Sequence, residues 1–211
     1  DFYKVITDID KMFRLKIEKK GLEFSRYFEN ETPQYICSDM NKIKQIIINL
    51  LGNALKFTKN GNISLTIYKD KSDEKKINVE VKDTGIGISR QDINKIFNPF
   101  VQTKKGREEG GTGLGLSISK KFAKLLGGDI NVDSEVNKGT LFNFYFKYEP
   151  GEINQIDINQ EKKEVIGIEN NSDNLKILIV DDRESNRDIL IRMLKKIGFI
   201  KPVGQRYLEE D

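Results

Sequence analysis

One amphipathic segment, from Ser38 to about Thr58, constrains the fold more than any other part of this sequence. Ser38 and Asp39 carry side chains that can cap the first turn of a helix. The apolar residues that follow recur at helical spacing and share one side of the helix: Ile43, Ile46, Ile47, Leu50, Ala54 and Phe57. The segment is therefore expected to form a long helix that packs this side against a core.

The other side of this helix is polar and contains Gln45, Asn49, Asn53 and Lys56. At about 100° per residue, these four fall within an arc of roughly 80°. One interpretation is the solvated face of an amphipathic helix. Solvated faces favour Lys, Glu and Gln, however, and Asn is a poor helix former. Amide oxygens are suited to Mg²⁺ that also binds substrate phosphates, and Lys56 could pair with phosphate charge.

Helical and strand patterns alternate around this helix as far as Tyr148. Further helices are predicted over residues 1–19 and 114–126, the second ended by a Gly-Gly pair. Ser89 and Asp92 form a capping-box pattern for a short helix ending near Phe97. Alternating or short apolar runs predict strands over residues 22–28, 35–37, 63–68, 77–82, 130–134 and 141–148.

The composition changes after Tyr148. Residues 149–174 are rich in Glu, Asn, Gln and Lys with little periodicity, which predicts a linker. The continuous apolar run Leu175–Val180 is typical of a strand buried on both faces. An amphipathic helix is predicted over residues 183–196, with these side chains inward: Ile189, Leu190, Met193, Leu194 and Ile197. We therefore expect a domain at 1–148, a linker at 149–174 and a smaller piece at 175–211.

Charge and hydropathy exclude several classes of protein. The 36 Lys and Arg against 33 Asp and Glu leave a net charge of +3, without the concentrated basic face of a nucleic-acid binder. The longest apolar stretch, residues 46–51, is too short to span a bilayer, so no membrane contact by this chain is expected. The charged opening, residues 1–20, is unlike a signal peptide.

The counts of cysteine and histidine also limit the chemistry. A single cysteine excludes an internal disulfide and a cysteine metal cluster, which fits a reducing, cytoplasmic compartment. The chain has no histidine. It therefore lacks the commonest general base, the commonest metal ligand and any site for a phosphohistidine.

Two glycine segments suggest a nucleotide site. Asp83-Thr84-Gly85-Ile86-Gly87 directly follows a predicted strand, where Asp83 could accept a hydrogen bond from a flat donor such as the adenine amino group. The missing side chains of Gly85 and Gly87 would let a base approach the backbone closely. The same residues are equally typical of an ordinary turn.

The second segment, Gly110 to Gly115, lies at the start of a predicted helix. Free backbone N–H groups and the helix dipole favour phosphate there, with a mobile hinge as the alternative. A Walker loop is excluded because no Lys-Ser/Thr pair follows these glycines. A dinucleotide fingerprint is excluded because Ile118 stands where the last glycine would be, counting from Gly113.

Between the two glycine segments, Phe97-Asn98-Pro99-Phe100 ends a predicted helix. A polar stretch follows that contains Lys104, Lys105 and Arg107. It is either a solvated loop after a proline break or a lid whose cations close over phosphates.

Taken in this order, the segments resemble the catalytic ATP-binding domain of sensor histidine kinases. That domain belongs to an ATPase group shared with type II topoisomerases and mismatch-repair ATPases. QIIINLLGNALKFT resembles its N box, DTGIGI its G1 box, FNPF its F box, GGTGLGLSI its G2 box and GTLFNF its last strand, covering about residues 1–148. The resemblance implies an α+β class and a Bergerat-type fold, a two-layer α/β sandwich in which helices cover one face of a mixed sheet.

The resemblance also implies roles for individual residues. Asn49 would coordinate Mg²⁺, and Asn53 with Lys56 would hold the phosphates of ATP. Asp83 would recognise the adenine amino group, with Thr140 nearby. The resemblance places these further residues around the nucleotide: Gly85, Gly87, Phe97, Phe100, Arg107 on the lid, Gly111, Thr112, Gly113, Leu114 and Gly115.

Gln45 separates two subfamilies under this resemblance. Topoisomerase and mismatch-repair relatives would have a glutamate there that activates water, whereas a neutral glutamine is a poor general base. Slow hydrolysis suits a kinase that keeps the γ-phosphate for a protein acceptor. Catalysis would then consist of positioning and of charge neutralisation by Mg²⁺, Lys56 and the lid.

The acceptor of the phosphate is the first departure from the family pattern. In sensor kinases the acceptor histidine lies on a helical hairpin immediately before this domain, and the hairpin also forms the dimer. The chain has no histidine and is expected to begin after that hairpin. It would therefore not phosphorylate itself but would deliver the γ-phosphate to a separate domain.

The second departure is ILIVDDRESNRDIL, which resembles the first strand and helix of a response-regulator receiver. Asp181 and Asp182 would be its acidic pair for Mg²⁺, the alternative being two ordinary acids after a buried strand. A receiver's acceptor aspartate ends its third strand, which would lie beyond residue 211. Residues 175–211 are thus expected to be a truncated α/β receiver fragment of a hybrid histidine kinase.

The sequence therefore predicts a catalytic domain that binds Mg·ATP and works in a two-component phosphorelay. Its expected partners are the histidine-bearing domain and a response regulator or receiver. One rival interpretation is an ATPase of the topoisomerase type, which Gln45 disfavours. Another is a pseudokinase that serves as a docking module.

Overall fold

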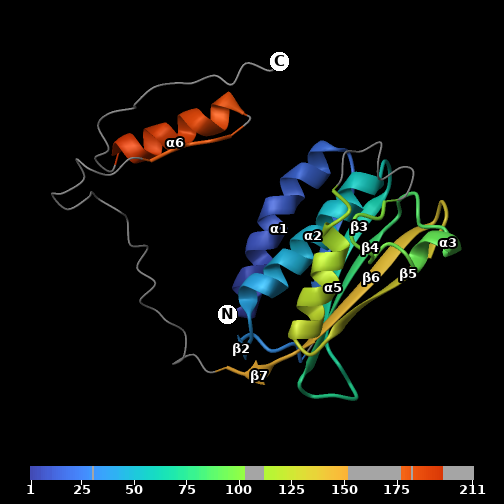
Figure 1. The fold of residues 1–211 in the computed structure, drawn as a ribbon. Coiled ribbons are helices and arrows are strands. Elements are labelled where there is room, and N and C mark those ends of the chain that lie inside the picture. The colour runs from blue at the N-terminus through green and yellow to red at the C-terminus, as the bar shows by residue number, and fades with distance from the viewer. Residues whose placement is uncertain (30, 103–111, 152–176, 182, 197–211) are drawn as a thin grey trace. The chain divides into compact units, whose positions relative to one another are not determined.

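The structure is a computed structural model that describes residues 1–29, 31–102, 112–151, 177–181 and 183–196. It divides into two compact units, Asp1–Ile156 and Asp157–Asp211 (Figure 1). The first unit contains every predicted nucleotide-site residue that the structure describes.

The elements of the first unit follow the sequence patterns closely. Its helices are α1 (Phe2–Lys19), α2 (Met40–Phe57), α3 (Arg90–Ile93) and α5 (Gly115–Leu125). Its strands are β1 (Glu23–Phe28), β2 (Ile36–Cys37), β3 (Asn62–Lys69), β4 (Lys76–Asp83), β5 (Asp129–Glu135), β6 (Gly139–Lys147) and β7 (Glu149–Pro150). The long helices and the predicted strands therefore begin and end within two residues of the expected positions, whereas α3 ends earlier than Phe97.

The helix starts are set by local capping. The Asp39 side chain accepts a hydrogen bond from the Lys42 N–H at 3.0 Å, which begins α2 where the sequence predicts. At α3, the Ser89 hydroxyl accepts from the Asp92 N–H at 3.3 Å and donates to the Asp92 carboxylate at 2.8 Å. The predicted capping interaction between Ser89 and Asp92 is thus confirmed.

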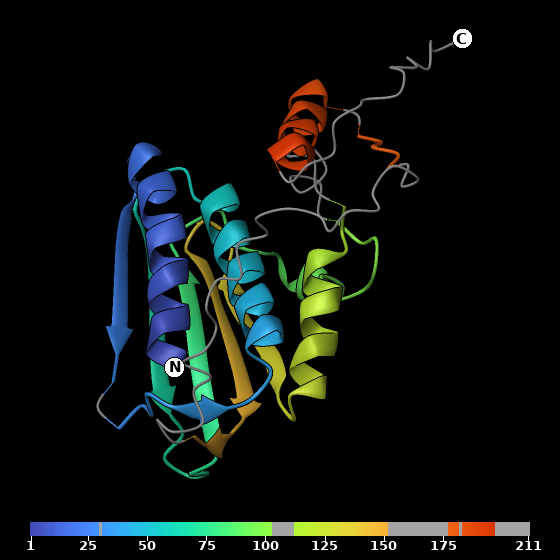
Figure 2. The same cartoon turned by 90° about the vertical axis from the view of Figure 1, so that its left-hand side faces the viewer.

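Five strands form one mixed sheet in the order β1-β3-β4-β6-β5. β1 pairs with β3 in parallel, and the other three pairings are antiparallel. Figures 1 and 2 show α1, α2 and α5 side by side over one face of this sheet. The expectation of a two-layer sandwich with helices on one face of a mixed sheet is confirmed.

The core lies between the helices and the sheet. Apolar residues at alternate positions of the strands and along one face of each long helix are buried there: Phe2, Ile6, Ile9, Ile43, Ile46, Leu50, Leu65, Val79, Val81, Phe142, Phe144 and Phe146. The Phe144 and Phe146 rings stack at a centroid distance of 5.3 Å. This core holds α2 against β4. The C-terminal end of α2 contacts the loop that follows β4, where the candidate site lies.

The prediction of a linker over residues 149–174 is wrong for its first two residues. Glu149 and Pro150 form β7, which pairs antiparallel with β2. The Gly151 N–H also donates to the Tyr35 carbonyl at 3.1 Å. Residues 152–174, the rest of the predicted linker, lie outside the described residues.

Gly52 provides a test of helix propensity in α2. A Cβ atom on Gly52 would meet no atom within 4 Å outside its own helix. Gly52→Ala is therefore expected to stabilise the protein by about 0.5–1 kcal/mol, since alanine loses less backbone entropy in a helix. Urea unfolding should give a higher midpoint than the wild type with an unchanged slope, and a lower midpoint would contradict the open space around Gly52.

The second unit confirms the predicted helix but corrects the predicted strand. α6 (Glu184–Lys196) begins one residue later than predicted. Residues 177–180 form no strand, and the side chains of Ile177, Leu178 and Val180 are 50%, 86% and 78% exposed. A strand is buried on both faces only when elements cover both sides. Among the described residues of this unit, α6 covers one side alone.

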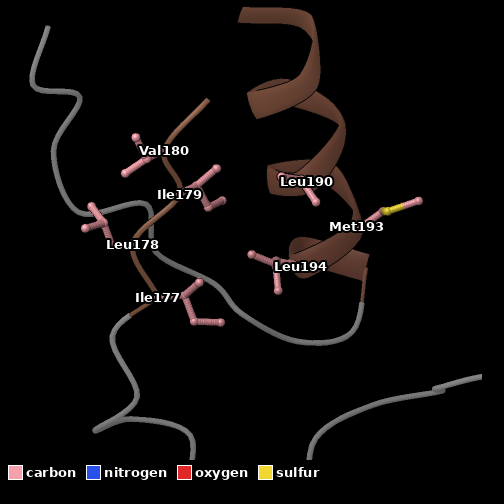
Figure 3. A pocket seen from close by; sticks show the side chains of 7 residues that line it. All are labelled: Ile177, Leu178, Ile179, Val180, Leu190, Met193 and Leu194. Carbon is pink, nitrogen blue, oxygen red and sulfur yellow. The ribbon is translucent and has the colours of Figure 1, made fainter. Parts of the chain in front are cut away.

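The prediction that α6 buries one apolar face is also wrong, because too few described elements of this unit cover that face. Ile189, Leu190 and Met193 are 54%, 43% and 61% exposed, and Ile197 lies outside the described residues. In Figure 3 the side chains of Ile177 and Ile179 point toward α6, whereas those of Leu178 and Val180 point away. A shallow apolar hollow remains, lined by residues 177–180 with Leu190, Met193 and Leu194.

Candidate functional site

A row of three polar residues crosses the end of the sheet. Asp83, the last residue of β4, lies opposite Thr140 of β6, and Thr140 lies opposite Ser134 of β5. Asp83 is 5% exposed and Thr140 is 7% exposed. Because alternate residues of a strand share a face and Val81 belongs to the core, this row lies on the helix-covered face.

Asp83 is a buried carboxylate without a cationic partner among the described residues. Its Oδ1 accepts a hydrogen bond from the Gly85 N–H at 2.8 Å. Burial raises the pKa of Asp83, and the N–H groups of Gly85 and Thr140 lower it in part. Buried charges are normally paired, so an unpaired buried carboxylate points to a functional site.

The loop after Asp83 is held from both sides. The Ile86 N–H donates to the Phe57 carbonyl at the end of α2 at 3.3 Å, and the Ile86 carbonyl accepts from the Asn137 N–H at 2.8 Å. The Ile88 N–H donates to Ser134 Oγ at 2.8 Å. Loop 84–88 is therefore fixed between α2 and the β5–β6 turn.

The glycines of this loop are required by the packing of the protein itself. A Cβ atom on Gly85 would lie 2.6 Å from the Phe57 carbonyl oxygen and 2.8 Å from Asp83 Oδ1. Gly87 has a φ of +66°, and its Cβ would overlap the Glu135 carbonyl. The approach of a base to these glycines stays a prediction, and the structure adds a second reason for them, because neighbouring protein atoms leave no room for a side chain.

The polar stripe of α2 faces α5 and the loop. Asn49, Asn53 and Lys56 are half-buried, and Gln45 is exposed. Asn49 Nδ2 donates to Ser119 Oγ in α5 at 2.9 Å. A Cβ atom on Gly115 would overlap Asn49 Oδ1, so the glycine lets the two helices meet closely at Asn49. α2 and α5 lie side by side in both views (Figures 1 and 2).

The other end of the stripe reaches the loop. Phe57 closes α2 and contacts Ile86, so Asn53 and Lys56 occupy the last turns of α2 beside loop 84–88. Lys56 Nζ lies 5.2 Å from the centroid of the Phe57 ring. Lys20 Nζ donates to the Leu55 carbonyl at 2.6 Å and thereby satisfies an open carbonyl at this helix end.

The flanks of the predicted lid meet each other. The Phe100 N–H donates to the Gly113 carbonyl at 3.0 Å, and the Leu114 N–H donates to Thr112 Oγ1 at 3.4 Å. Phe100 has a φ of +63° and is 75% exposed. Phe97 is half-buried beneath Lys120, whose Nζ lies 4.7 Å from the ring centroid.

Part of the predicted site lies outside the described residues. Arg107 and Gly111 fall in residues 103–111, and Asp182 falls in the second unit. Asp181 is described: its Oδ1 accepts from the Arg183 N–H at 2.8 Å and from Asn186 Nδ2 at 3.1 Å. These bonds tie Asp181 to the start of α6.

Two serines of the site were missed by the sequence reasoning. Ser119 contacts Asn49, and Ser134 contacts both Thr140 and the Ile88 N–H. A signal for Ser134 exists in the sequence, because it follows Ile130 and Val132 on the inward side of β5, where an apolar residue is expected. Ser119 breaks the apolar face of α5 in the same way.

The donor set for a metal is made of amides. No group of three or more Cys, Asp or Glu residues is placed to hold a metal ion within the described ranges. Any Mg²⁺ here would depend on amide oxygens such as those of Asn49 and Asn53 together with substrate phosphates. No helix in the described part of the chain is long and apolar enough to cross a bilayer.

Comparisons with known proteins agree with this geometry. A family described as histidine kinase-, DNA gyrase B-, and HSP90-like ATPases matches residues 38–150. The chain is 32% identical over 201 residues to the aerobic respiration control sensor protein ArcB of Escherichia coli K12, covering 94% of this chain and 25% of that protein. The chain thus spans about a quarter of the length of this relative.

Solved structures of histidine kinases have the same fold. The catalytic domain of histidine kinase ThkA is 34% identical, with a TM-score of 0.60 over 71% of this chain and 96% of that chain. Full-length ShkA in complex with AMPPNP is 28% identical, with a TM-score of 0.64 over 72% of this chain and 31% of that chain.

Proposed function

The chain belongs to the family of histidine kinase-, DNA gyrase B- and HSP90-like ATPases, and we propose that it is the ATP-binding catalytic domain of a sensor histidine kinase. It binds Mg·ATP between the last turns of α2, loop 84–88 and the start of α5. It transfers the γ-phosphate to a histidine that lies outside these 211 residues, because the chain has none.

The observation that carries this proposal is Asp83, a buried carboxylate that has no cationic partner in the part of the chain that the structure describes. A carboxylate accepts hydrogen bonds at about four positions, and the Gly85 N–H occupies one of them at 2.8 Å. The adenine amino group supplies the missing donor. It is uncharged, flat and suited to a pocket where loop 84–88 is already fixed by Phe57 and Ser134.

The polar stripe of α2 would hold the phosphates. Asn49, Asn53 and Lys56 offer amide oxygens for Mg²⁺ and one cation for phosphate, and Arg107 would add a second cation from the lid. Mg²⁺, when bound, neutralises phosphate charge and orients the γ-phosphate for attack. The protein's part is to position the nucleotide and to keep its phosphates between α2 and the first turn of α5, where free N–H groups favour anions.

The stripe favours phosphate transfer over hydrolysis. Gln45, Asn49, Asn53 and Lys56 include no carboxylate and no imidazole, so none of them is a good general base for water. ATP would therefore be hydrolysed slowly and retained for the protein acceptor. This distinguishes the proposal from an ATPase of the topoisomerase type.

We also propose that the parent protein is a hybrid kinase whose receiver begins in the second unit. The order of an apolar run, Asp181 and then α6 supports this interpretation. Residues 177–180 and α6 share an apolar hollow that further receiver elements would cover. A response regulator or receiver would then be the next phosphate acceptor, in a cytoplasmic phosphorelay.

The proposal is tested with radiolabelled ATP, Mg²⁺ and histidine-bearing hairpins supplied from several sensor kinases. We expect an acid-labile phosphate on a hairpin and little free phosphate when the hairpin is omitted. Steady-state phosphate release without a hairpin would favour the ATPase. Nucleotide binding with neither transfer nor release would favour a docking module.

A further inference from the structure

We infer that Ser134 sets the direction of the Thr140 hydroxyl proton and thereby makes the site select an amino-purine over an oxo-purine. This inference rests on the proposed function, because it concerns the base of the same nucleotide. It gives Ser134 the role of a positioning residue that acts through Thr140.

Ser134 and Thr140 of this row are joined by a hydrogen bond between their hydroxyl groups. Ser134 Oγ lies 2.9 Å from Thr140 Oγ1 and 2.8 Å from the Gly139 carbonyl oxygen. It also accepts from the Ile88 N–H at 2.8 Å. Thr140 is also the register partner of Asp83 across the β4–β6 pair, and its backbone N–H lowers the pKa of the Asp83 carboxyl.

The number of protons decides which hydroxyl donates. A serine hydroxyl has one proton and two lone pairs. The Gly139 carbonyl can only accept, so Ser134 makes all three bonds only if it donates to Gly139 and accepts from both Ile88 and Thr140. If Ser134 donated to Thr140 instead, its contact with the Gly139 carbonyl would contain no proton. The first arrangement satisfies one more hydrogen bond inside the protein.

The proton of Thr140 is therefore committed to Ser134. Toward a ligand, Thr140 Oγ1 presents lone pairs, as the ionised carboxylate of Asp83 does beside it. This edge of the site then offers acceptors only. An amino group, which carries two N–H donors, matches it directly or through a shared water. At the position of the adenine amino group, the C6 carbonyl oxygen of inosine or guanine brings another acceptor, so the lone pairs that would meet the amino group lack a donor.

A purely structural role for Ser134 predicts a different result. Its bond to the Ile88 N–H holds loop 84–88, and loss of that bond would weaken binding of every purine nucleotide alike. The ratio of affinities for an amino-purine and an oxo-purine would then be unchanged. That ratio, rather than affinity itself, separates the two roles.

The experiment measures dissociation constants for ADP and inosine diphosphate by calorimetry with Mg²⁺. Wild type is expected to prefer ADP, and Ser134→Ala to reduce this preference about tenfold. Thr140→Val should reduce it by a similar factor. The double variant should show no further loss of preference, because Ser134 affects the choice of base only through the Thr140 hydroxyl. Thr140→Ser keeps a hydroxyl and should keep the preference.

Ser64→Ala is the matched control, since Ser64 lies between buried Ile63 and Leu65 on the other face of the sheet. It should leave both affinities unchanged. Equal weakening of ADP and inosine diphosphate by Ser134→Ala, or independent effects in the double variant, would overturn the inference. If wild type binds ADP but shows no preference, the inference fails and the proposed function stands. If wild type binds neither nucleotide, both fail.

Discussion

Asp83→Asn is expected to weaken adenine-nucleotide binding by roughly 100-fold or more, because it removes a charge-assisted hydrogen bond at a buried site. The new Oδ1 can still accept from the Gly85 N–H, as Asp83 Oδ1 does at 2.8 Å. The new –NH₂ group then takes the place of the second carboxylate oxygen. It opposes the adenine amino group, so two donors face each other. Calorimetry with ADP measures the loss directly.

The same substitution should not destabilise the protein at neutral pH. Burial raises the pKa of Asp83 above its ordinary value. A carboxyl group with a raised folded-state pKa contributes stability that is fully present below its unfolded pKa and is lost as the pH rises through its folded pKa. Above that folded-state pKa the protein bears the cost of a buried charge that Asn lacks. We expect a urea midpoint equal to or above that of wild type.

The pH dependence gives the substitution a second readout. As the pH falls through the raised pKa of Asp83, wild type regains stability relative to the variant, and its affinity for adenosine falls because the carboxylate becomes protonated. Adenosine replaces ADP in this measurement because it has no phosphate groups that would titrate in the same pH range. Asp133→Asn, at an exposed position of β5, is the control and should alter neither property. Unchanged ADP binding by Asp83→Asn would remove the main support for the proposed function.

The sequence predicted the elements that are determined by nearby residues. α2 follows from a periodic apolar face and from Asp39, which lies three residues before the Lys42 N–H that it caps. The strand alternation around Val79 and Val81 likewise identified the inward face of β4. Local spacing therefore gave the polar stripe of α2 and the position of Asp83 at the end of a strand.

The contacts that complete the site could not be predicted in this way, because they join residues far apart in the chain. The bond between Ile88 and Ser134 spans 46 residues, and the bond between Asn49 and Ser119 spans 70. Both depend on how the sheet and helices pack together. The prediction of a buried strand at 177–180 failed because composition alone does not determine burial. The apolar composition indicates burial, but burial needs covering elements on both sides.

Gly139→Ala is expected to cost about 3–5 kcal/mol of stability, the largest effect of any single methyl group considered for this chain. Gly139 begins β6 with a φ of +115°, which L residues rarely adopt. An added Cβ atom would overlap the carbonyl oxygen of Asp83 and lie 2.8 Å from the Asp83 carbonyl carbon. These are backbone atoms of the β4–β6 pair, so they cannot move without opening the pairing of Asp83 with Thr140.

Gly21→Ala is a control that has backbone strain from a positive φ but no steric overlap of the added Cβ atom. Gly21 also has a positive φ, +76°, but its added Cβ would meet no atom within 4 Å. It should cost only about 1–2 kcal/mol, the penalty for a left-handed backbone. The difference between the two urea midpoints then reports the overlap with Asp83 together with the greater strain of a φ of +115°. Equal losses of stability in the two variants would contradict the predicted overlap, because they would mean that the backbone near Gly139 relaxes at little cost.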